Sequence, residues 1–205
     1  MRDFYQSLHV SPTTASSAGI VFEARAHHFL QEGRTLEILP ILSSSQLRGG
    51  KHLKYVYDKY VDDRKTMLRF TLPVLQQYRV NKDTRHTHEL HVYYRPQISN
   101  FASVDSWVIV KPNPEEPPIV LAFQMTINKK EHDAKPIGLD RLRALVPEDA
   151  QVYYIVITPE EVTPEINVSA DYLTAAFLNG RNVNKAFPVF HCKIEIAELF
   201  KPRLT

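Results

Sequence analysis

Apolar residues gather in short runs along the second half of the chain, and polar or proline-rich segments separate these runs. Three of them fall at 103–110, 119–127 and 151–158. Short runs that are rich in Val, Ile and aromatic residues are typical of β-strands. The run at 151–158, QVYYIVIT, is apolar almost throughout, which indicates a central strand that is buried on both faces.

The first two runs flank the polar segment KPNPEEPP, residues 111–118, which predicts a turn. We therefore expect 103–110 and 119–127 to pair as a hairpin. A later run, 189–196, alternates between apolar and polar residues, which predicts a strand with one polar face. Its expected inward residues are Phe190, Cys192, Ile194 and Ile196, and its expected outward residues are His191, Lys193 and Glu195.

Two segments carry the signals of helices. Residues 16–33, SSAGIVFEARAHHFLQEG, begin with serines that can cap a helix and end at Gly33. The second helix, 136–146, starts at Pro136, a residue favoured in the first helical turn. The expected apolar stripes are Ile20, Val21, Ala24 and Phe29 in the first helix, and Ile137, Leu139, Leu142, Leu145 and Val146 in the second.

The remaining segments carry weaker secondary-structure signals. Residues 34–42 predict a strand, 43–52 a turn, and 88–94 an extended segment, whereas 51–60 and 66–75 fit either two strands or a strand and a helix. The order of elements predicts an α/β fold with a central mixed sheet flanked by helices. We expect residues 1–18 to be an N-terminal lead-in and 19–205 to form a single domain.

Polar residues interrupt both strands of the predicted hairpin. Asp105 lies in the first strand, and Gln124 and Thr126 point to one face of the second. Burying such groups costs free energy unless they are paired, so they are either a satisfied polar pair or part of a site. Carboxylate and amide oxygens are ligands for Mg²⁺, and a bound metal can promote phosphodiester cleavage. Glu23, on the first predicted helix, is a candidate for a further carboxylate.

The segment YYRPQISNFASVDSW…IVLAFQMTINKKEHDAKPIGLDRLRAL…YYIVIT resembles the nuclease-like domain of the Crinkler and retrotransposon-hot-spot (RHS) proteins of fungi, oomycetes and protists. The resemblance is tight over about 65 residues, and FQMT is its most specific part. The matching positions are Pro96, Asn100, Asp105, Ser106, Phe123, Gln124, Met125, Thr126, His132, Lys135, Gly138 and Leu139.

That family is assigned to the PD-(D/E)XK superfamily, so the resemblance implies a restriction-endonuclease-like core. The superfamily pattern is an acid on one strand and Glu-x-Lys on the next. The resemblance implies catalytic roles for Asp105, Gln124, Thr126 and Glu23. It also implies that Glu23, Asp105 and Gln124 hold Mg²⁺ or Mn²⁺.

The chain departs from this pattern at two places, because Gln124 and Thr126 stand where the superfamily carries Glu and Lys. A glutamine offers a metal an oxygen without charge, and a threonine cannot supply the positive charge of lysine. Lys129, Lys130 and Lys135 follow the strand and could replace the missing lysine.

Basic residues also cluster before the second helix, whose N-terminus attracts anions. The candidates for nucleic-acid binding are Lys129, Lys130, His132, Lys135, Arg141, Arg143 and His27. The alternative is a solvated loop and helix face, with His27 pairing locally with Glu23 one turn away.

These observations predict a divalent-metal-dependent nuclease that hydrolyses phosphodiester bonds, with DNA favoured over RNA and a role as an effector or in genome conflict. The alternative is a catalytically degenerate nuclease fold that binds nucleic acid or a protein partner. A homodimer is compatible with either function. A third option, an effector that acts on a host protein, rests only on the biology of the resembling family.

The composition of the chain does not distinguish between these functions. The formal net charge is +2 with a pI of about 8.6, too weakly basic to indicate nucleic-acid binding alone. The single cysteine, Cys192, excludes an intrachain disulfide, and its apolar setting predicts a small buried side chain. HTHELH, residues 86–91, does not have the HExxH spacing of a zinc site. Without an apolar leader or an apolar run of membrane-spanning length, we expect a cytoplasmic or nuclear protein with no membrane partner.

Overall fold

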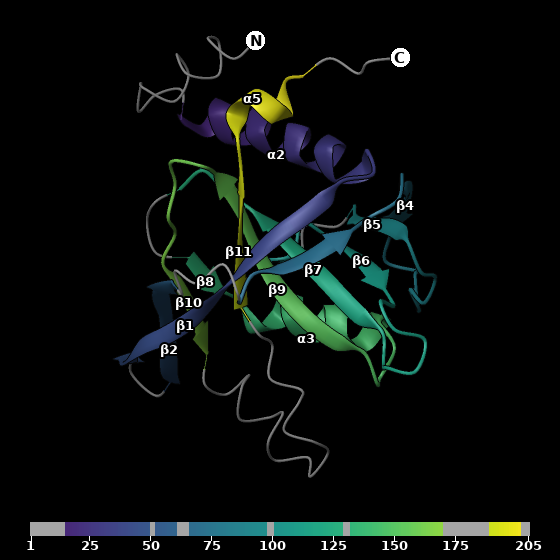
Figure 1. The fold of residues 1–205 in the computed structure, drawn as a ribbon. Coiled ribbons are helices and arrows are strands. Elements are labelled where there is room, and N and C mark those ends of the chain that lie inside the picture. Colours follow the sequence, from purple (N-terminus) through teal and green to yellow (C-terminus); the bar gives the residue numbers. More distant parts are fainter. Residues whose placement is uncertain are drawn as a thin grey trace.

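A computed structural model describes residues 15–49, 52–60, 66–97, 101–128, 132–169 and 189–201. These residues form a large, curled mixed sheet with helices on its two faces, which confirms the predicted α/β class (Figure 1). The helices are α2 (Ala15–Gln31), α3 (Pro136–Leu145) and α5 (Ile196–Leu199). The strands are β1 (Thr35–Gly49), β2 (His52–Tyr60), β3 (Leu68–Thr71), β4 (Gln76–Val80), β5 (Val92–Pro96), β6 (Ser106–Val110), β7 (Ile119–Met125), β8 (His132–Ala134), β9 (Gln151–Pro159), β10 (Ile166–Ser169) and β11 (Val189–Ile194).

The strand order is β4-β5-β6-β7-β9-β11-β1-β2-β10-β8, with β3 paired to β1. Strands β5, β6 and β7 form an antiparallel meander, and α3 then leads the chain to β9, which is parallel to β7. The predicted hairpin is confirmed, because Ser106 pairs with Phe123 and Val110 pairs with Ile119. The predicted central strand is confirmed as well, since β9 lies between β7 and β11.

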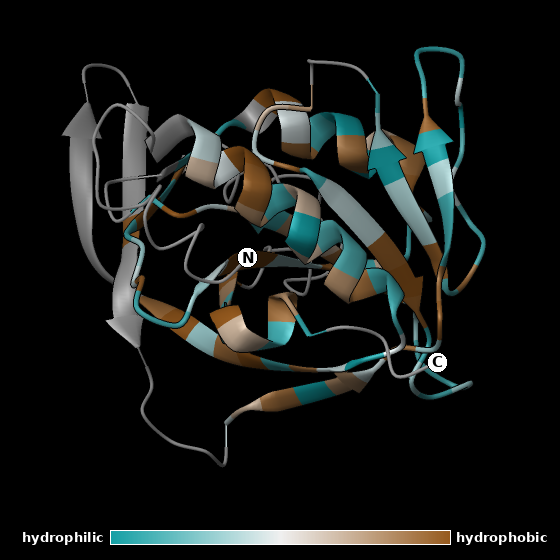
Figure 2. Cartoon of the chain, turned by 90° about the horizontal axis from the view of Figure 1, so that it is seen from above, coloured by the Kyte–Doolittle hydropathy of each residue, from teal (hydrophilic) through white to brown (hydrophobic). Residues whose placement is uncertain are grey.

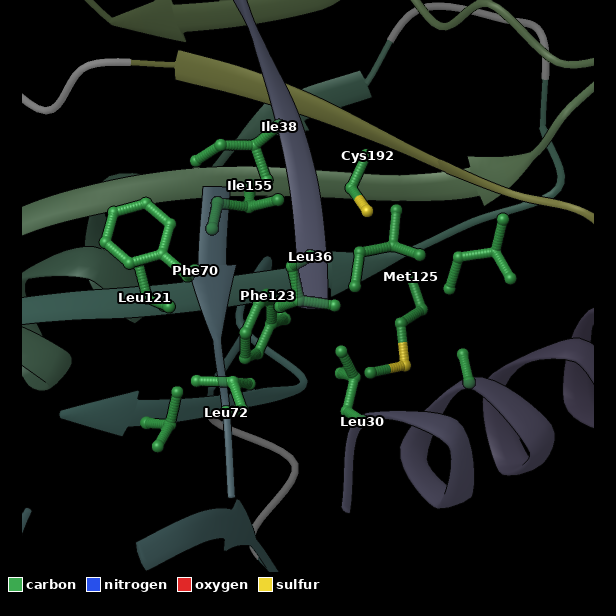
Figure 3. Packing of buried hydrophobic residues seen from close by; sticks show 14 of the residues in the cluster. Leu30, Leu36, Ile38, Phe70, Leu72, Leu121, Phe123, Met125, Ile155 and Cys192 are labelled. Atoms are coloured by element: carbon green, nitrogen blue, oxygen red, sulfur yellow. The ribbon is translucent and has the colours of Figure 1, made fainter. Parts of the chain in front are cut away.

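Helices α2 and α5 lie on one face of the sheet and α3 lies on the other (Figure 1). The core beneath α2 contains Leu30 from the helix and Phe123, Met125 and Ile155 from the sheet (Figure 3). The core beneath α3 contains Leu139, Leu142, Trp107 and Tyr154 among others. Each face therefore has its own apolar cluster, which is why β6, β7 and β9 are apolar on both sides.

Helix α2 differs from the prediction in the face that it buries. Its fully buried residues are Ala18, Phe22, Ala26 and Leu30, whereas Ile20 is 70% exposed. The buried series repeats every fourth residue, and the predicted Val21 and Phe29 lie beside it, half-buried against the same cluster, whereas Ala24 is exposed. Figure 2 shows α2 lying across the sheet with brown and teal residues interleaved along it. In α3 the predicted stripe holds except at Ile137, which is 64% exposed.

Strand β11 also departs from the alternating prediction. His191 is buried, because it lies on the face of β11 that also buries Val189 in the cluster beneath α3. Its Nε2 atom lies 2.8 Å from the hydroxyl of Thr158, which satisfies one side of the ring. Ile196 is buried as predicted, but it starts helix α5 and is not part of the strand.

The turn predicted at 43–52 was wrong, because β1 continues to Gly49 and pairs with β2 over that stretch. The pairing register between β1 and β2 shifts between Leu42 and Ser45. The serine-rich segment therefore contains a β-bulge or a similar irregularity and still remains part of the strand. The segments left open resolve into strands β2 and β3. Helix α2 begins at Ala15, ahead of the predicted domain start, and residues 1–14 lie outside the described residues.

Candidate functional site

Asp105 sits directly before β6, at the end of the hairpin where β7 leaves the sheet. Its backbone N–H donates to the carbonyl of Phe123 at 2.8 Å, which fixes it beside the second strand. Its Oδ2 atom accepts the backbone N–H of Met125 at 2.6 Å and the side-chain amide of Gln124 at 3.4 Å. The hairpin therefore brings Asp105 and Gln124 together, as the sequence predicted.

Both ends of the Gln124 amide have partners. Its Nε2 faces Asp105, and its Oε1 accepts a hydrogen bond from the hydroxyl of Tyr154 at 3.2 Å. Tyr154 comes from β9 and belongs to the cluster beneath α3, so Gln124 points to that face of the sheet. A tyrosine hydroxyl can donate or accept, so a rotated amide could donate to Tyr154 and turn its oxygen toward Asp105.

Thr126 closes the end of β7. Its backbone N–H donates to the carbonyl of Ile157 at 2.9 Å, and its hydroxyl accepts the N–H of Asn128 at 3.0 Å. This second bond is a local side-chain turn of the kind that Ser and Thr form. The observed contacts of Thr126 therefore shape the strand end.

Glu23 approaches the same end of the hairpin from α2, on the opposite face to Gln124. Its Oε1 atom lies 3.4 Å from Nε2 of His27 and 3.7 Å from the guanidinium of Arg95. The contact with His27 lowers the pKa of Glu23 and outweighs the opposing effect of burial, and Arg95 lowers it further. Glu23 is thus a carboxylate at neutral pH, held by one helix neighbour and one strand neighbour.

A buried polar chain joins Glu23 to the residue next to Asp105. The Nδ1 atom of His27 lies 2.7 Å from the hydroxyl of Tyr93, which in turn lies 2.7 Å from the hydroxyl of Ser106. Burial lowers the pKa of His27, so the ring is neutral at neutral pH. A neutral ring that carries its proton on Nε2, facing Glu23, accepts at Nδ1 from Tyr93. The chain then runs from Ser106 through Tyr93 and His27 to Glu23.

The acidity of Asp105 is strongly perturbed. Burial raises the pKa of Asp105 to about 7, although the hydrogen bond from Met125 opposes the change. The negative charge of Glu23 raises this pKa further, and the positive charge of Arg95 lowers it. The two carboxyl groups are therefore close enough to interact, and Asp105 changes its charge near neutral pH.

Arg95 is the positive charge that the sequence analysis missed. It lies on β5 and faces α2, where it contacts Glu23 and acts on the pKa of both acids. Its signal in the sequence was weak, because only the pairing of β5 with β6 brings it to the site. Tyr93, two residues earlier on the same face, could have indicated that this face turns inward.

The segment before α3 packs against the loop that carries Asp105. Ser103 has a φ of 72°, a left-handed conformation that is uncommon for residues other than glycine. Its hydroxyl donates to the carbonyl of Asp133 and accepts the N–H of Lys135, both at 3.0 Å. A side chain at Gly138 would overlap the carbonyl oxygen of Ala102 in the same loop. Lys135 and Gly138, both in the resembling segment, therefore pack against the loop that leads to Asp105.

The other predicted nucleic-acid contacts have varied positions. Arg141 lies over the ring of Phe101 at 5.4 Å, and Arg143 donates to the carbonyl of Ala150 at 2.8 Å. Each guanidinium thus has a contact within the protein. Lys135 is exposed, and His132 begins β8. Lys129 and Lys130 lie outside the described residues.

The oxygen ligands near Asp105 can be compared with those that a divalent metal requires. Among the described residues, no three His, Cys, Asp or Glu side chains converge as a protein-made metal cage would require. A magnesium ion needs fewer protein ligands, since it keeps several waters and uses one or two carboxylates. Asp105 and Glu23 repel each other electrostatically, which a cation between them would relieve. Asp105 and Glu23 are thus two carboxylates of the kind that Mg²⁺ or Mn²⁺ takes from a protein, whereas Gln124 lies on the opposite face from Glu23 and turns its amide nitrogen to Asp105.

Two further groups, the Cys192 thiol and the pair His86 and His88, do not have the surroundings of a nucleophile or of a metal site in the described part of the chain. Burial raises the pKa of the Cys192 thiol to about 12, so it is protonated and inert, as its apolar setting predicted. The rings of His86 and His88 lie 5.2 Å apart on an exposed segment, and none of the described acids or cysteines joins them in a metal cluster.

Comparisons of the chain with protein-family models, with curated proteins and with solved structures found no match. In the described part of the chain, no helix is long and apolar enough to cross a membrane.

Proposed function

We propose that this protein is a divalent-metal-dependent nuclease that cleaves phosphodiester bonds at the end of the β6–β7 hairpin. One observation carries the proposal: Asp105 is hydrogen-bonded to Gln124 and lies within electrostatic range of Glu23. These are the residues to which the family resemblance assigns the metal. They lie in three separate segments, α2, the residue before β6 and β7, so it is the fold that brings them to the same end of the hairpin.

The topology supports a restriction-endonuclease-like core as part of this proposal. An antiparallel meander is followed by a crossover helix and a parallel strand, and a further helix on the other face supplies an acid. The resembling superfamily keeps an acid on one strand and its next catalytic positions on the neighbouring strand. Asp105 and Gln124 stand in that relation across the ladder between β6 and β7.

When bound, the metal would lower the pKa of a coordinated water and stabilise charge on the phosphate. The chain's own residues hold and orient the groups around it. Met125 and Gln124 fix the carboxyl of Asp105, and His27 fixes that of Glu23. Arg95 supplies the fixed positive charge that Thr126 cannot, and a guanidinium binds phosphate oxygens well.

The direct test is a cleavage assay on single- and double-stranded DNA and RNA with Mg²⁺, with Mn²⁺ and with EDTA. We expect metal-dependent cleavage, with DNA the better substrate, and its loss in Asp105→Ala. A matched control is Asp133→Ala, which removes an exposed acid of β8. Full activity in Asp105→Ala would contradict the proposal.

The hydrogen bonds at both ends of the Gln124 amide favour a second function, nucleic-acid binding without cleavage. Because both its ends are already bonded within the protein, the site can exist as a complete polar cluster without metal. The fold would then bind nucleic acid and not cleave it. This version predicts binding that weakens steeply with salt and no turnover with either metal.

A further inference from the structure

Two hollows adjoin at Arg95, on the face of the sheet that carries α2. One of about 290 Å³ is lined by Arg95 together with residues of α2 and the segment before β4, among them His27, Gln31 and Val74. The other, of about 280 Å³, is lined by Gln77, Arg79, Arg95, Pro96 and Gln97. We refer to these two hollows together as the groove. Arg95 lines both of them and contacts Glu23, and the second hollow includes residues of β4, which ends the strand order on this side of the sheet.

The groove contains two arginines in direct register. Strands β4 and β5 are parallel, and Arg79 pairs with Arg95, so both side chains lie on the same face. Like charges placed opposite each other on a sheet destabilise it unless an anion lies between them. Arg95 has Glu23 at 3.7 Å, whereas no acid among the described residues pairs with Arg79.

The remaining lining groups can also bind an anion. Gln77 lies two residues before Arg79 on the same face of β4, and Gln97 follows β5 at the same end. Amide and guanidinium groups both donate hydrogen bonds, and guanidinium binds phosphate oxygens in pairs. Among the described residues that line this hollow, none is a carboxylate. Its chemistry is therefore that of a phosphate site at the edge of the sheet.

We propose that this hollow binds the phosphate backbone of a nucleic-acid strand and leads the strand past Arg95 to the site at Asp105. The identity of the ligand rests on the proposed function, whereas the existence of an anion site rests on the groove itself. Arg79 is a binding residue in this scheme, and it has no part in the chemistry.

Binding is measured without cleavage, by the fluorescence anisotropy of a labelled 20-nucleotide single strand and of its duplex in EDTA over a series of salt concentrations. Arg79→Gln is compared with Arg69→Gln, which removes another exposed arginine, paired with Glu37 on the neighbouring strand. We expect Arg79→Gln to weaken binding severalfold and to reduce the salt slope by about 0.7–0.9, the change for one lost phosphate contact. We expect Arg69→Gln to bind like wild type.

Equal binding by the two variants, or no binding by wild type, would overturn the inference. So would full competition by millimolar inorganic phosphate with no dependence on strand length, since that result would describe a site for free phosphate. Cleavage is a separate readout. A wild-type protein that binds through Arg79 but cuts nothing would refute the nuclease and leave this inference intact.

Discussion

The hydroxyl of Tyr93 bridges His27 and Ser106, lying 2.7 Å from Nδ1 of the first and 2.7 Å from Oγ of the second. One atom therefore joins α2, β5 and the start of β6 at a buried position. This hydroxyl contributes strongly to the free energy of unfolding for a single group, because two buried polar side chains would each lose a hydrogen-bond partner without it.

Tyr93→Phe tests this bridge. The change leaves His27 and Ser106 each without one buried partner, and we expect it to lower the free energy of unfolding by about 1–3 kcal/mol. Urea denaturation followed by circular dichroism measures the difference. The control is Tyr78→Phe, since Tyr78 lies on the adjacent strand and is 50% exposed. A loss in Tyr93→Phe no greater than in the control would show that the bridge contributes nothing.

The raised pKa of Asp105 predicts a pH dependence of stability. The unfolded carboxyl ionises near pH 4, whereas the folded carboxyl ionises at about pH 7. Between these values the folded state holds the extra proton, so this group makes the protein less stable as the pH rises from 4 to 7. Burial lowers the pKa of His27, which has the opposite effect below about pH 6.5.

Asp105→Asn separates the two effects, because an asparagine oxygen can still accept from Met125 and carries no charge. In EDTA, we expect the variant to gain stability relative to wild type as the pH is raised from 5 to 8. Melting temperatures across that range provide the measurement. A difference between variant and wild type that does not change with pH would mean that Asp105 has an ordinary pKa.

Gln124→Glu restores the charge that the resembling superfamily carries at this position. Without metal, a second carboxylate beside Asp105 should destabilise the fold by about 1–3 kcal/mol, since like charges in a partly buried site repel. With Mg²⁺ we expect a larger rise in melting temperature than for wild type, together with faster cleavage. Gln124→Leu is the control, because it removes the amide without adding charge. Equal Mg²⁺ responses in Glu and Leu variants would argue against a metal at this position.

Gly138→Ala tests the contact between α3 and the loop that carries Asp105. The added methyl group would overlap the carbonyl oxygen of Ala102, so either the helix or the loop must move. We expect a loss of at least about 1–3 kcal/mol, as for other overpacked sites, and reduced activity.

Gly19→Ala is the matched control for that change. Gly19 is also helical, but among the described residues a side chain there would meet just the side chain of Ile127, at an ordinary 3.9 Å. We expect it to stabilise the protein by up to about 1 kcal/mol, the usual helix preference for alanine. Thermal unfolding of the two variants side by side measures both effects, and equal shifts would contradict the packing seen at Gly138.

The sequence was informative where a segment's structure depends on its own residues. The hairpin of β6 and β7, the central strand β9 and helix α3 all follow from local apolar patterns and their polar boundaries. The pairing of Asp105 with Gln124 followed from strand parity together with that hairpin.

The sequence-based prediction of side-chain burial and contacts failed where segments distant in the sequence surround a residue. Ile20 and Phe22 are equally apolar in the sequence, and only the position of the sheet buries the second and exposes the first. His191 is buried because the cluster beneath α3 covers its face of β11, which the local alternation predicted to be exposed. Arg95 reaches Glu23 through the packing of α2 on β5, which no segment of the sequence encodes alone.

Strand β1 bears on the order in which the molecule assembles. It pairs with β11, joining residues near opposite ends of the described chain, as in the register of Leu39 with His191. During synthesis β1 emerges well before β11, so the edge of β1 that pairs with β11 stays open until that later strand is made. Long-range pairings of this kind slow folding and expose strands to aggregation. A chaperone that shields β1 in the nascent chain should therefore raise the yield of folded protein more than one that acts after release.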